Sequence, residues 1–389
     1  MSIPHDPQLP LLADLLDREA ARLLLDAALP ETIAAVRITD VAYQPGRLIT
    51  VRYSIEVAGA PAPVVITAMH GAGMPAGGVR VSDGAGEVAL WRFPDDPGLP
   101  GLALVLDAGA LTGMLAVLGI HDGVPVATLR AHRPGRRAVV EVRTPHHRLF
   151  VKVVRPKRVA ELQGIHAALA PHVPIPRSLG WQPDLGVVFL DALPGIPLAA
   201  ALVGGQVALV AGPDELIALL DLIAGCTVEA RPRPGPLERA GDHAATLGLV
   251  VPEAAADLAE IVAALGAAPA EEPITAHRDF HASQLLIHDG RLRLVDVDTV
   301  GTGTRADDLA MLLAQAACLA RPGPSQAAVE VYRRVATQRF EEVVDPSSLR
   351  LRTAAALLGF AIGPYRTQEG EWRHETLRRI AAARVLAQG

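Results

Sequence analysis

Cysteine, lysine and asparagine are scarce or missing in this chain of 389 residues. Its two cysteines, Cys226 and Cys318, lie in separate Ala/Leu-rich stretches without a Cys/His metal-ligand spacing, so neither a disulfide framework nor a structural zinc site is indicated. Among the 36 basic residues only Lys152 and Lys157 are lysines, so a reaction that needs an ammonium group has two candidates. Asparagine is absent, which excludes N-glycosylation and asparagine metal ligands.

Charge is also modest, and no uninterrupted membrane-length apolar run occurs. Half of the residues are hydrophobic and 20% are charged, which excludes a mainly disordered chain. A net charge of −6 argues against a surface devoted to nucleic acid or anionic lipid, so we expect a small-molecule partner and neither nucleic acid nor a membrane. Residues 101–120 contain Asp107 and several glycines, which favours a core helix over a membrane span. The N-terminus lacks a secretory signal pattern, so we expect a cytoplasmic protein of unknown oligomeric state.

Two sets of β-rich segments follow an N-terminal helical pattern that ends at Pro30. The first set covers 38–57, 64–69 and 87–93, and the second covers 125–143 and 148–154. Both contain a Pro-Gly-Arg hairpin, Tyr43 to Arg47 in one and His132 to Arg136 in the other, at a constant offset of 89. Aligning the third strands places Thr67 opposite Lys152. The sets therefore indicate an internal repeat, although common turn chemistry explains the likeness equally well.

Helical patterns dominate the rest of the chain. A helix is predicted from Val159, and a buried strand at 186–198 leads into a Pro/Gly linker. Ala/Leu patterns predict further helices at 199–226, 253–267, 306–320, 325–342 and 348–361. We therefore predict an α+β fold with a cap subdomain at 1–122, an antiparallel β lobe at 123–194 and a mainly helical lobe at 195–389.

Most candidate functional residues lie in segment 274–310. Asp279 lies in a polar loop, and Asp289-Gly290 is typical of a hairpin turn before the strand RLRLVDVD. On that strand Asp296 and Asp298 are two residues apart and are expected on the same face. Together with the amide oxygen of Gln284, they predict a site for a hard divalent cation, for which Mg²⁺ is the best fit.

These residues resemble the aminoglycoside phosphotransferase and choline kinase-like small-molecule kinases, a family with a bilobal protein-kinase-like fold. The segment from His277 to Gln284 fits the family's H-x-D-x-x-x-x-N loop with Gln at the Asn position. The resemblance implies that Asp279 orients the acceptor hydroxyl and accepts its proton, and that Asp296 binds the Mg²⁺ bridging the phosphates of ATP. Asp308, in the family's D-L-A element, is expected to cap the following helix rather than to contact substrate. Asp298 has two alternative roles, as a second metal ligand or as a cap at the end of the strand.

The resemblance extends upstream to the nucleotide lobe. It implies that Lys152 on a third strand holds the α- and β-phosphates and that Glu161, on the next helix, keeps the lysine in place. The backbone around Leu190 to Ala192 would bind adenine. No G-x-G-x-x-G loop is present, so Arg136 and its neighbouring arginines are expected to face the phosphates instead.

The acceptor is less defined. Members similar to bacterial maltokinase and glucosamine kinase also carry an N-terminal cap, which favours a sugar, amino sugar or aminoglycoside-like acceptor. Glu369, Glu371, Trp372 and Glu375 either contact such a substrate or form a charged helix face. Because Gln284 departs from the family pattern, a nucleotide-binding module without turnover is the alternative function.

Overall fold

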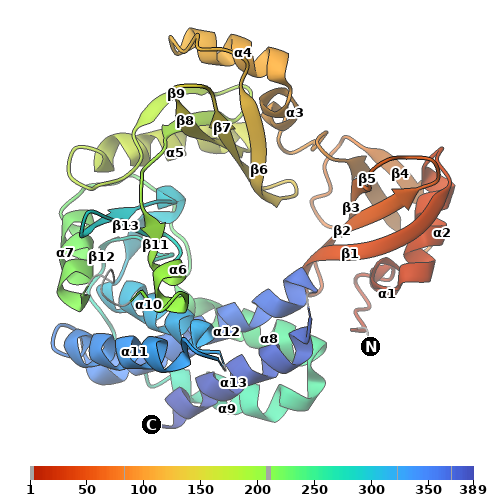
Figure 1. Cartoon of the computed structure of the whole chain (residues 1–389). Helices are drawn as coiled ribbons and strands as arrows, with labels where there is room; N and C mark the ends of the chain where they lie inside the picture. The colour runs from red at the N-terminus through yellow and green to blue at the C-terminus, as the bar shows by residue number, and fades with distance from the viewer. Residues whose placement is uncertain (1–3, 83, 207–211, 322, 369) are drawn as a thin grey trace. The chain divides into compact units, whose positions relative to one another are not determined.

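The computed structural model describes residues 4–82, 84–206, 212–321, 323–368 and 370–389 (Figure 1). The chain forms two compact units. Unit 1 combines Met1–Val159, Leu179–Leu190 and Pro364–Arg373, and unit 2 combines Ala160–Ser178, Asp191–Gly363 and His374–Gly389. The predicted cap and most of the predicted nucleotide lobe therefore share unit 1, and their division at residue 122 stays a proposal.

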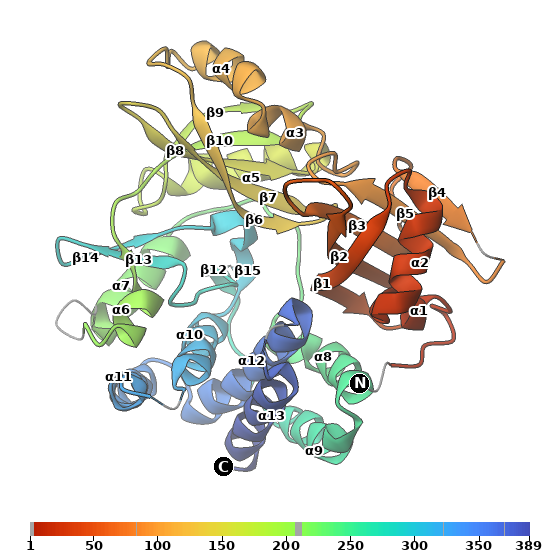
Figure 2. The same ribbon diagram turned by 45° about the vertical axis from the view of Figure 1, so that its right-hand side comes forward.

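The first half of unit 1 is a five-stranded antiparallel sheet with two short helices. Its elements are α1 (Leu12–Leu16), α2 (Arg18–Ala28), β1 (Ile33–Gln44), β2 (Leu48–Val57), β3 (Val64–Gly71), β4 (Val79–Ser82) and β5 (Glu87–Arg92). The strand order is β1-β2-β3-β5-β4. Figure 2 shows α2 lying along this sheet. The fully buried Tyr53 joins the two layers, since its hydroxyl donates to the backbone oxygen of Leu15 at 2.6 Å.

The second half of unit 1 repeats this plan. Its elements are α3 (Gly101–Leu106), α4 (Ala108–Val117), β6 (Val126–Arg133), β7 (Arg137–Arg143), β8 (Arg148–Val154), α5 (Pro156–Leu169, which continues into unit 2), β9 (Ser178–Gln182) and β10 (Val187–Asp191). The strand order β6-β7-β8-β10-β9 is that of the first sheet. Asp107 divides the apolar stretch at 101–120 into two helices and caps the second by accepting from the amide of Ala110.

The common strand order confirms the predicted repeat, and the likeness extends beyond the hairpins. The sequence DPQLPLLADLLD at 6–17 corresponds to DPGLPGLALVLD at 96–107, and the final aspartate of each is a helix N-cap. The copies differ between the third and fourth strands. The first copy connects them by a short loop, whereas the second inserts α5, the helix that carries Glu161.

The strand register corrects the predicted partner of Lys152. Lys152 pairs with Val139 on the neighbouring strand, and the residue at offset 89 from Val139 is Thr50, which pairs with Met69. Met69 is therefore equivalent to Lys152, and the prediction for Thr67 is wrong. The loop from the second to the third strand is longer in the first copy, and this length change displaced the sequence alignment by two residues.

Unit 2 is mainly helical around small β elements. The helices are α6 (Leu198–Val203), α7 (Pro213–Ala224), α8 (Pro236–Val250), α9 (Ala255–Leu265), α10 (Arg305–Leu319), α11 (Gln326–Phe340), α12 (Pro346–Thr367, ending in unit 1) and α13 (Trp372–Gln388), with 3₁₀ turns η2 (Pro252–Ala254) and η3 (Val297–Thr299). The strands are β11 (Ile196–Pro197), β12 (Ile274–Ala276), β13 (Leu285–His288), β14 (Arg291–Leu294) and β15 (Gly301–Gly303). Helix α8 lies outside the sequence predictions, whereas α13 begins at Trp372, where a charged helix face is one of the two predictions.

Each unit has its own apolar core. In unit 1 the second sheet packs on α3 and α4 through a fully buried cluster that includes Leu102, Val140 and Phe189. In unit 2 the core centres on Phe280, Leu309 and Phe340. The α+β class with antiparallel sheets and a helical C-terminal part is thereby confirmed. None of the described helices is both long and apolar enough to span a membrane.

Candidate active site

The predicted catalytic loop connects β12 to β13 and is held by a buried carboxylate. The side chain of Asp308 on α10 accepts from the backbone amides of His277 at 2.7 Å and of Arg278 at 2.6 Å. Thr299 donates its hydroxyl to the backbone oxygen of His277 at 2.8 Å. These contacts fix Arg278 at a φ of 67°, a left-handed conformation that is strained for a side chain other than glycine. The residue after this strained position is Asp279.

The contacts of Asp308 correct its predicted role as a helix cap. Thr304 caps α10 by accepting from the amide of Asp307 at 3.1 Å, whereas Asp308 reaches back to the catalytic loop. Burial raises the pKa of Asp308 to about 7 although the two backbone donors act in the opposite direction, and the charges of Asp307 and Asp279 add to the rise. Asp308 is therefore a positioning residue whose protonation changes near neutral pH.

Asp279 itself is accessible. A third of its side chain is exposed, and one carboxylate oxygen lies 3.7 Å from Nε2 of His281. The His281 ring meets the ring of Phe360 on α12 edge to face, with 6.2 Å between the ring centroids. A carboxylate that can be reached from solvent, on a backbone fixed from behind, is the arrangement that proton acceptance from a bound hydroxyl requires.

Gln284 and Asp296 are in contact, as predicted for a shared site. The Gln284 amide nitrogen donates to Asp296 at 3.2 Å, and the backbone oxygen of Gln284 accepts from Val295 at 2.9 Å. The prediction that Asp296 and Asp298 share a strand face is wrong. Strand β14 ends at Leu294, Asp296 adopts a left-handed conformation with φ 59°, and Asp298 lies in the 3₁₀ turn η3.

The side chains at this point fit a hard cation whose coordination shell is completed by substrate and water. Over the described residues no three His, Cys, Asp or Glu side chains form a metal-binding group. One carboxylate and one amide oxygen are nevertheless donors that Mg²⁺ takes when phosphate oxygens and water supply the others. The Gln284 amide would turn its oxygen toward the ion, in place of the nitrogen that faces Asp296. Asp296 and Gln284 would hold the ion, and the role of Asp298 as a ligand stays a proposal.

Lys152 lies buried on β8, and a cluster of arginines forms on the same sheet. The buried carboxylate of Glu141 on β7 accepts from Nε of Arg130 at 2.7 Å, of Arg143 at 2.9 Å and of Arg148 at 2.6 Å. Burial raises the pKa of Glu141, but these hydrogen bonds outweigh it and lower the pKa to about 2. These three arginines are therefore engaged with a carboxylate of their own sheet.

The other predicted nucleotide residues lie on separate elements. Arg136 is exposed at the β6–β7 hairpin in unit 1. Glu161, on the part of α5 that belongs to unit 2, accepts from the amide of Arg231 at 3.2 Å. Leu190 is buried in β10 and Ala192 follows the strand. The Lys152–Glu161 pair and the adenine contacts stay predictions.

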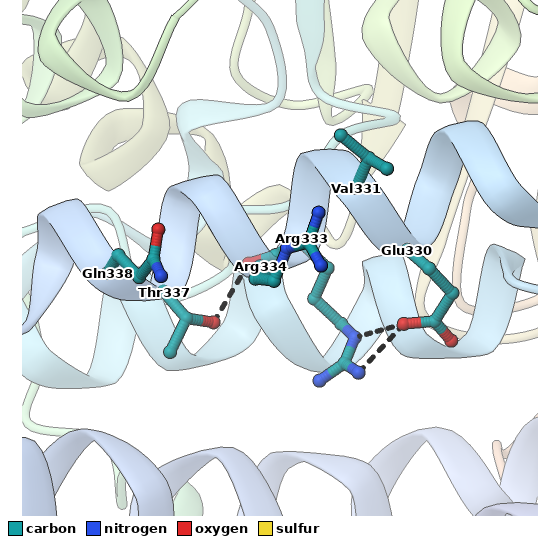
Figure 3. A pocket seen from close by; sticks show the side chains of 6 residues that line it. All are labelled: Glu330, Val331, Arg333, Arg334, Thr337 and Gln338. Carbon is teal, nitrogen blue, oxygen red and sulfur yellow. Dashed lines mark hydrogen bonds and ion pairs between the residues drawn. The ribbon is translucent and has the colours of Figure 1, made fainter.

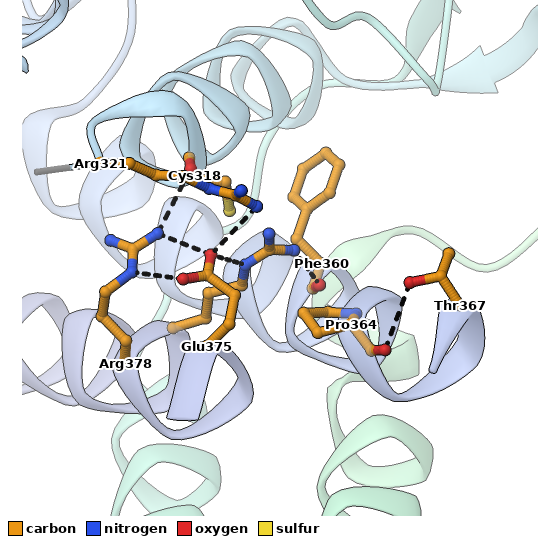
Figure 4. A network of polar contacts seen from close by, with 8 residues as sticks. Cys318, Arg321, Phe360, Pro364, Thr367, Glu375 and Arg378 are labelled. Carbon is orange, nitrogen blue, oxygen red and sulfur yellow. Dashed lines mark hydrogen bonds and ion pairs between the residues drawn. The ribbon is translucent and has the colours of Figure 1, made fainter. Parts of the chain in front are cut away.

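One of the C-terminal acids, Glu375, is engaged with arginines, as Figure 4 shows. Glu375 forms ion pairs with Arg378 at 2.8 Å, Arg379 at 2.9 Å and Arg321 at 3.7 Å. Burial raises the pKa of Glu375, but hydrogen bonds from Arg378 and Arg379 outweigh it and lower the pKa to about 2. This carboxylate serves the packing of α13 rather than an acceptor, and Glu369 lies outside the described residues.

Two surface hollows lie away from these residues. One of about 360 Å³ follows a single face of α11, where Arg333 pairs with Glu330 (Figure 3). The other, of about 420 Å³, adjoins β11 and the Asp289-Gly290 turn. Neither is lined by a predicted site residue, so neither is assigned to the acceptor.

Sequence reasoning missed two buried carboxylates that position loops. The sequence predicts only a cap role for Asp308, because its contact with residues 277 and 278 depends on a fold that no local pattern shows. Asp96 lies in unit 1 beneath the second Pro-Gly-Arg hairpin, and its hydrogen bonds are described below. The repeated DP-x-LP sequence was the available signal for Asp96, because an aspartate at the same place in both copies indicates a shared structural role.

Comparisons with known proteins identify a family for this chain. Residues 128–343, more than half of the chain, match the model of the phosphotransferase enzyme family. Similar solved structures include a choline kinase from Cryptosporidium parvum Iowa II, with 11% identity and a TM-score of 0.49 over 72% of this chain and 96% of that chain. A thermostable mutant of the aminoglycoside phosphotransferase APH(4)-Ia has 15% identity and a TM-score of 0.47, over 67% of this chain and 92% of that chain. An ethanolamine kinase from Plasmodium vivax has 11% identity and a TM-score of 0.42, over 66% of this chain and 82% of that chain.

Comparison with curated protein sequences gave no match. The family match contains every residue of the catalytic loop, the Gln284–Asp296 contact and Lys152. The chain belongs to the phosphotransferase enzyme family and is a small-molecule kinase.

Proposed function

We propose that the chain transfers the γ-phosphoryl group of ATP to a hydroxyl of a sugar, an amino sugar or an aminoglycoside-like molecule. The observation that carries this proposal is the placement of Asp279. Its carboxylate is accessible, and the two amides that precede it along the backbone are bound by Asp308. Asp279 orients the acceptor hydroxyl and accepts its proton as the new phosphate ester bond forms.

The remaining roles follow the family pattern. Lys152 and Arg136 bind the phosphates, Glu161 keeps Lys152 in position, and the backbone at 190–192 binds adenine. Asp296 and Gln284 would hold a magnesium ion, which would neutralise charge on the phosphates. Since ATP is the phosphoryl donor, we propose the cytoplasm as the location.

The acceptor class is supported by the aromatic side chain near Asp279. Phe360 is partly exposed, and its ring contacts His281, which lies beside Asp279. The apolar face of a sugar ring packs on an aromatic side chain, while its hydroxyls reach neighbouring polar groups. A sugar or amino sugar placed on Phe360 would present a hydroxyl toward the Asp279 loop.

A coupled ADP-release assay over a panel of sugars, amino sugars, aminoglycosides and amino alcohols tests this function. Asp279→Asn should lower turnover about 10²- to 10⁴-fold and leave ATP binding intact, because only proton acceptance is lost. Asp296→Ala should weaken binding of Mg-ATP itself. Asp289→Asn is the control, because Asp289 is an exposed aspartate at the nearby hairpin turn.

Two results would contradict the proposal. Wild-type turnover in Asp279→Asn would remove the assigned role from this carboxylate. Binding of Mg-ATP without ADP release for any acceptor would favour the nucleotide-binding module without turnover.

A further inference from the structure

A buried carboxylate lies beneath the Pro-Gly-Arg hairpin of the second sheet. Asp96, which is 4% exposed, accepts from the amide of Gly135 at 2.7 Å and contacts Nε2 of His132 at 3.0 Å. Its other oxygen accepts from the amide of Gly98 at 2.9 Å. At the next peptide group, Arg155 donates to the backbone oxygen of Gly135 at 2.5 Å. The tip of the hairpin is therefore fixed through both its amide and its carbonyl group.

These contacts use the backbone donors that a phosphate would need. Pro134 has no N–H, the amide of Gly135 binds Asp96, and the amide of Arg136 binds the backbone oxygen of Arg133 at 2.9 Å. Phosphate-binding loops rich in glycine depend on such amides and close over the ligand as flexible flaps. In this hairpin the groups that extend beyond the backbone are arginine side chains.

The first sheet has an equivalent buried aspartate beneath its hairpin, but it lacks the predicted nucleotide-binding lysine. Asp6 accepts from the amide of Gly46 at 2.7 Å, from the hydroxyl of Tyr43 at 2.9 Å and from the amide of Gln8 at 3.0 Å. This copy lacks an equivalent of Lys152, since Met69 takes that place. The chain thus supplies an internal control in which a buried aspartate binds the amide of the equivalent hairpin glycine.

We propose that Asp96 is a positioning residue that locks hairpin 133–137 as a rigid platform, from which Arg136 binds the phosphates of ATP by its side chain instead of by backbone amides. The inference rests on the proposed function, because it needs ATP at the second sheet. Because the backbone is already fixed, binding orders only the arginine side chain, whose guanidinium matches the geometry of phosphate oxygens. Asp96 acts through the loop and does not touch the nucleotide.

Binding of ATP, ADP and adenosine, measured by calorimetry on the full chain, tests this role. Asp96→Asn should raise the Kd for Mg-ATP about tenfold and leave the Kd for adenosine unchanged, because only phosphate contacts depend on the hairpin. Asp6→Asn should lower the melting temperature to a similar extent without changing either Kd. Arg136→Ala should weaken Mg-ATP binding about tenfold, and Arg47→Ala, at the equivalent exposed position of the first copy, should not.

A second pair of variants tests the link without removing the carboxylate. His132→Gln retains a side-chain N–H for Asp96 and should keep the wild-type Kd for Mg-ATP, whereas His132→Phe should raise it. If both Asp96→Asn and His132→Phe kept the wild-type ratio of the Kd values for Mg-ATP and adenosine, the inference would be overturned. An equal rise of the Kd for Mg-ATP in Asp6→Asn would also overturn it. Failure of wild type to bind Mg-ATP would overturn the proposed function as well. Normal binding in wild type together with a defect in Lys152→Met alone would overturn only the role of Asp96.

Discussion

The two lysines of the chain occupy opposite environments. Lys152 is buried between valines on β8, whereas Lys157 is exposed on α5. Lys152→Met introduces the residue that the first copy carries at the equivalent place, so the fold should be retained. Loss of one charge-assisted phosphate contact should raise the ATP KM or lower kcat by roughly ten- to a hundredfold. Steady-state kinetics measure this effect, with Lys157→Met as the control, and equal defects in both variants would contradict the assigned role.

The buried carboxyl of Asp308 should make stability depend on pH. Its pKa is about 7 in the folded chain and near 3.8 when unfolded, so the folded state retains a proton that the unfolded state has released. The free energy of unfolding should therefore fall as pH rises from about 4 to 7, by at most about 1.4 kcal/mol for each pKa unit. Urea unfolding of wild type and Asp308→Asn at several pH values isolates this contribution, because the variant lacks the titrating group.

Asp308→Asn should also affect the catalytic loop. The amide has one acceptor oxygen for two backbone donors, so one buried N–H loses its partner at a cost of about 1–3 kcal/mol. A variant with the pH profile of wild type would show that Asp308 does not titrate in this range.

At the scale of elements, the ion-pair network of α13 should stabilise the helical unit. Glu375 is largely buried among Arg378, Arg379 and Arg321, so Glu375→Ala leaves several cations near one another and should cost about 1–3 kcal/mol. The difference from wild type should shrink as pH falls from about 4.5 toward 2, because the lowered pKa of Glu375 makes its contribution a property of the charged form. Chemical denaturation measures both effects.

The control for this network is another glutamate of a C-terminal helix. Glu330 pairs with Arg333 on the exposed face of α11, and Glu330→Ala should cost at most about 0.5 kcal/mol. A larger loss from Glu330→Ala than from Glu375→Ala would contradict the assignment of Glu375 as the stabilising centre.

Local patterns predicted the elements whose signals lie within a few residues. The Pro-Gly-Arg and Asp-Gly hairpins and the helix from 306 are examples, because turn chemistry and apolar spacing are local properties. The same reasoning extended β14 to Asp298, although the chain turns left-handed at Asp296 to bring that carboxylate to Gln284. A strained residue at a candidate site is not visible in a propensity pattern, since tertiary contacts impose the conformation.

At the scale of the whole molecule, the sequence was sufficient for the α+β class and for the contact between Gln284 and Asp296. The functional roles of Asp279, Gln284 and Asp296 stay predictions. The sequence was not sufficient for the partner of Lys152, whose equivalence to Met69 depends on strand register. Nor could it assign Asp308, since the contact joins residues 30 positions apart. Contacts between distant segments are what local spacing cannot encode.

The duplication in unit 1 presents a problem of correct docking during folding. Segments 6–17 and 96–107 carry nearly the same signals, so each has the pattern needed to pack on either sheet. Two glycines of segment 96–107 distinguish it from segment 6–17. A side chain at Gly98 would lie 2.8 Å from the Gly135 backbone, and one at Gly101 would lie 2.5 Å from Val187, whereas the first segment has glutamine and leucine at those places. The second sheet thus rejects the wrong segment by steric exclusion, so a chain with two similar halves avoids exchanging them.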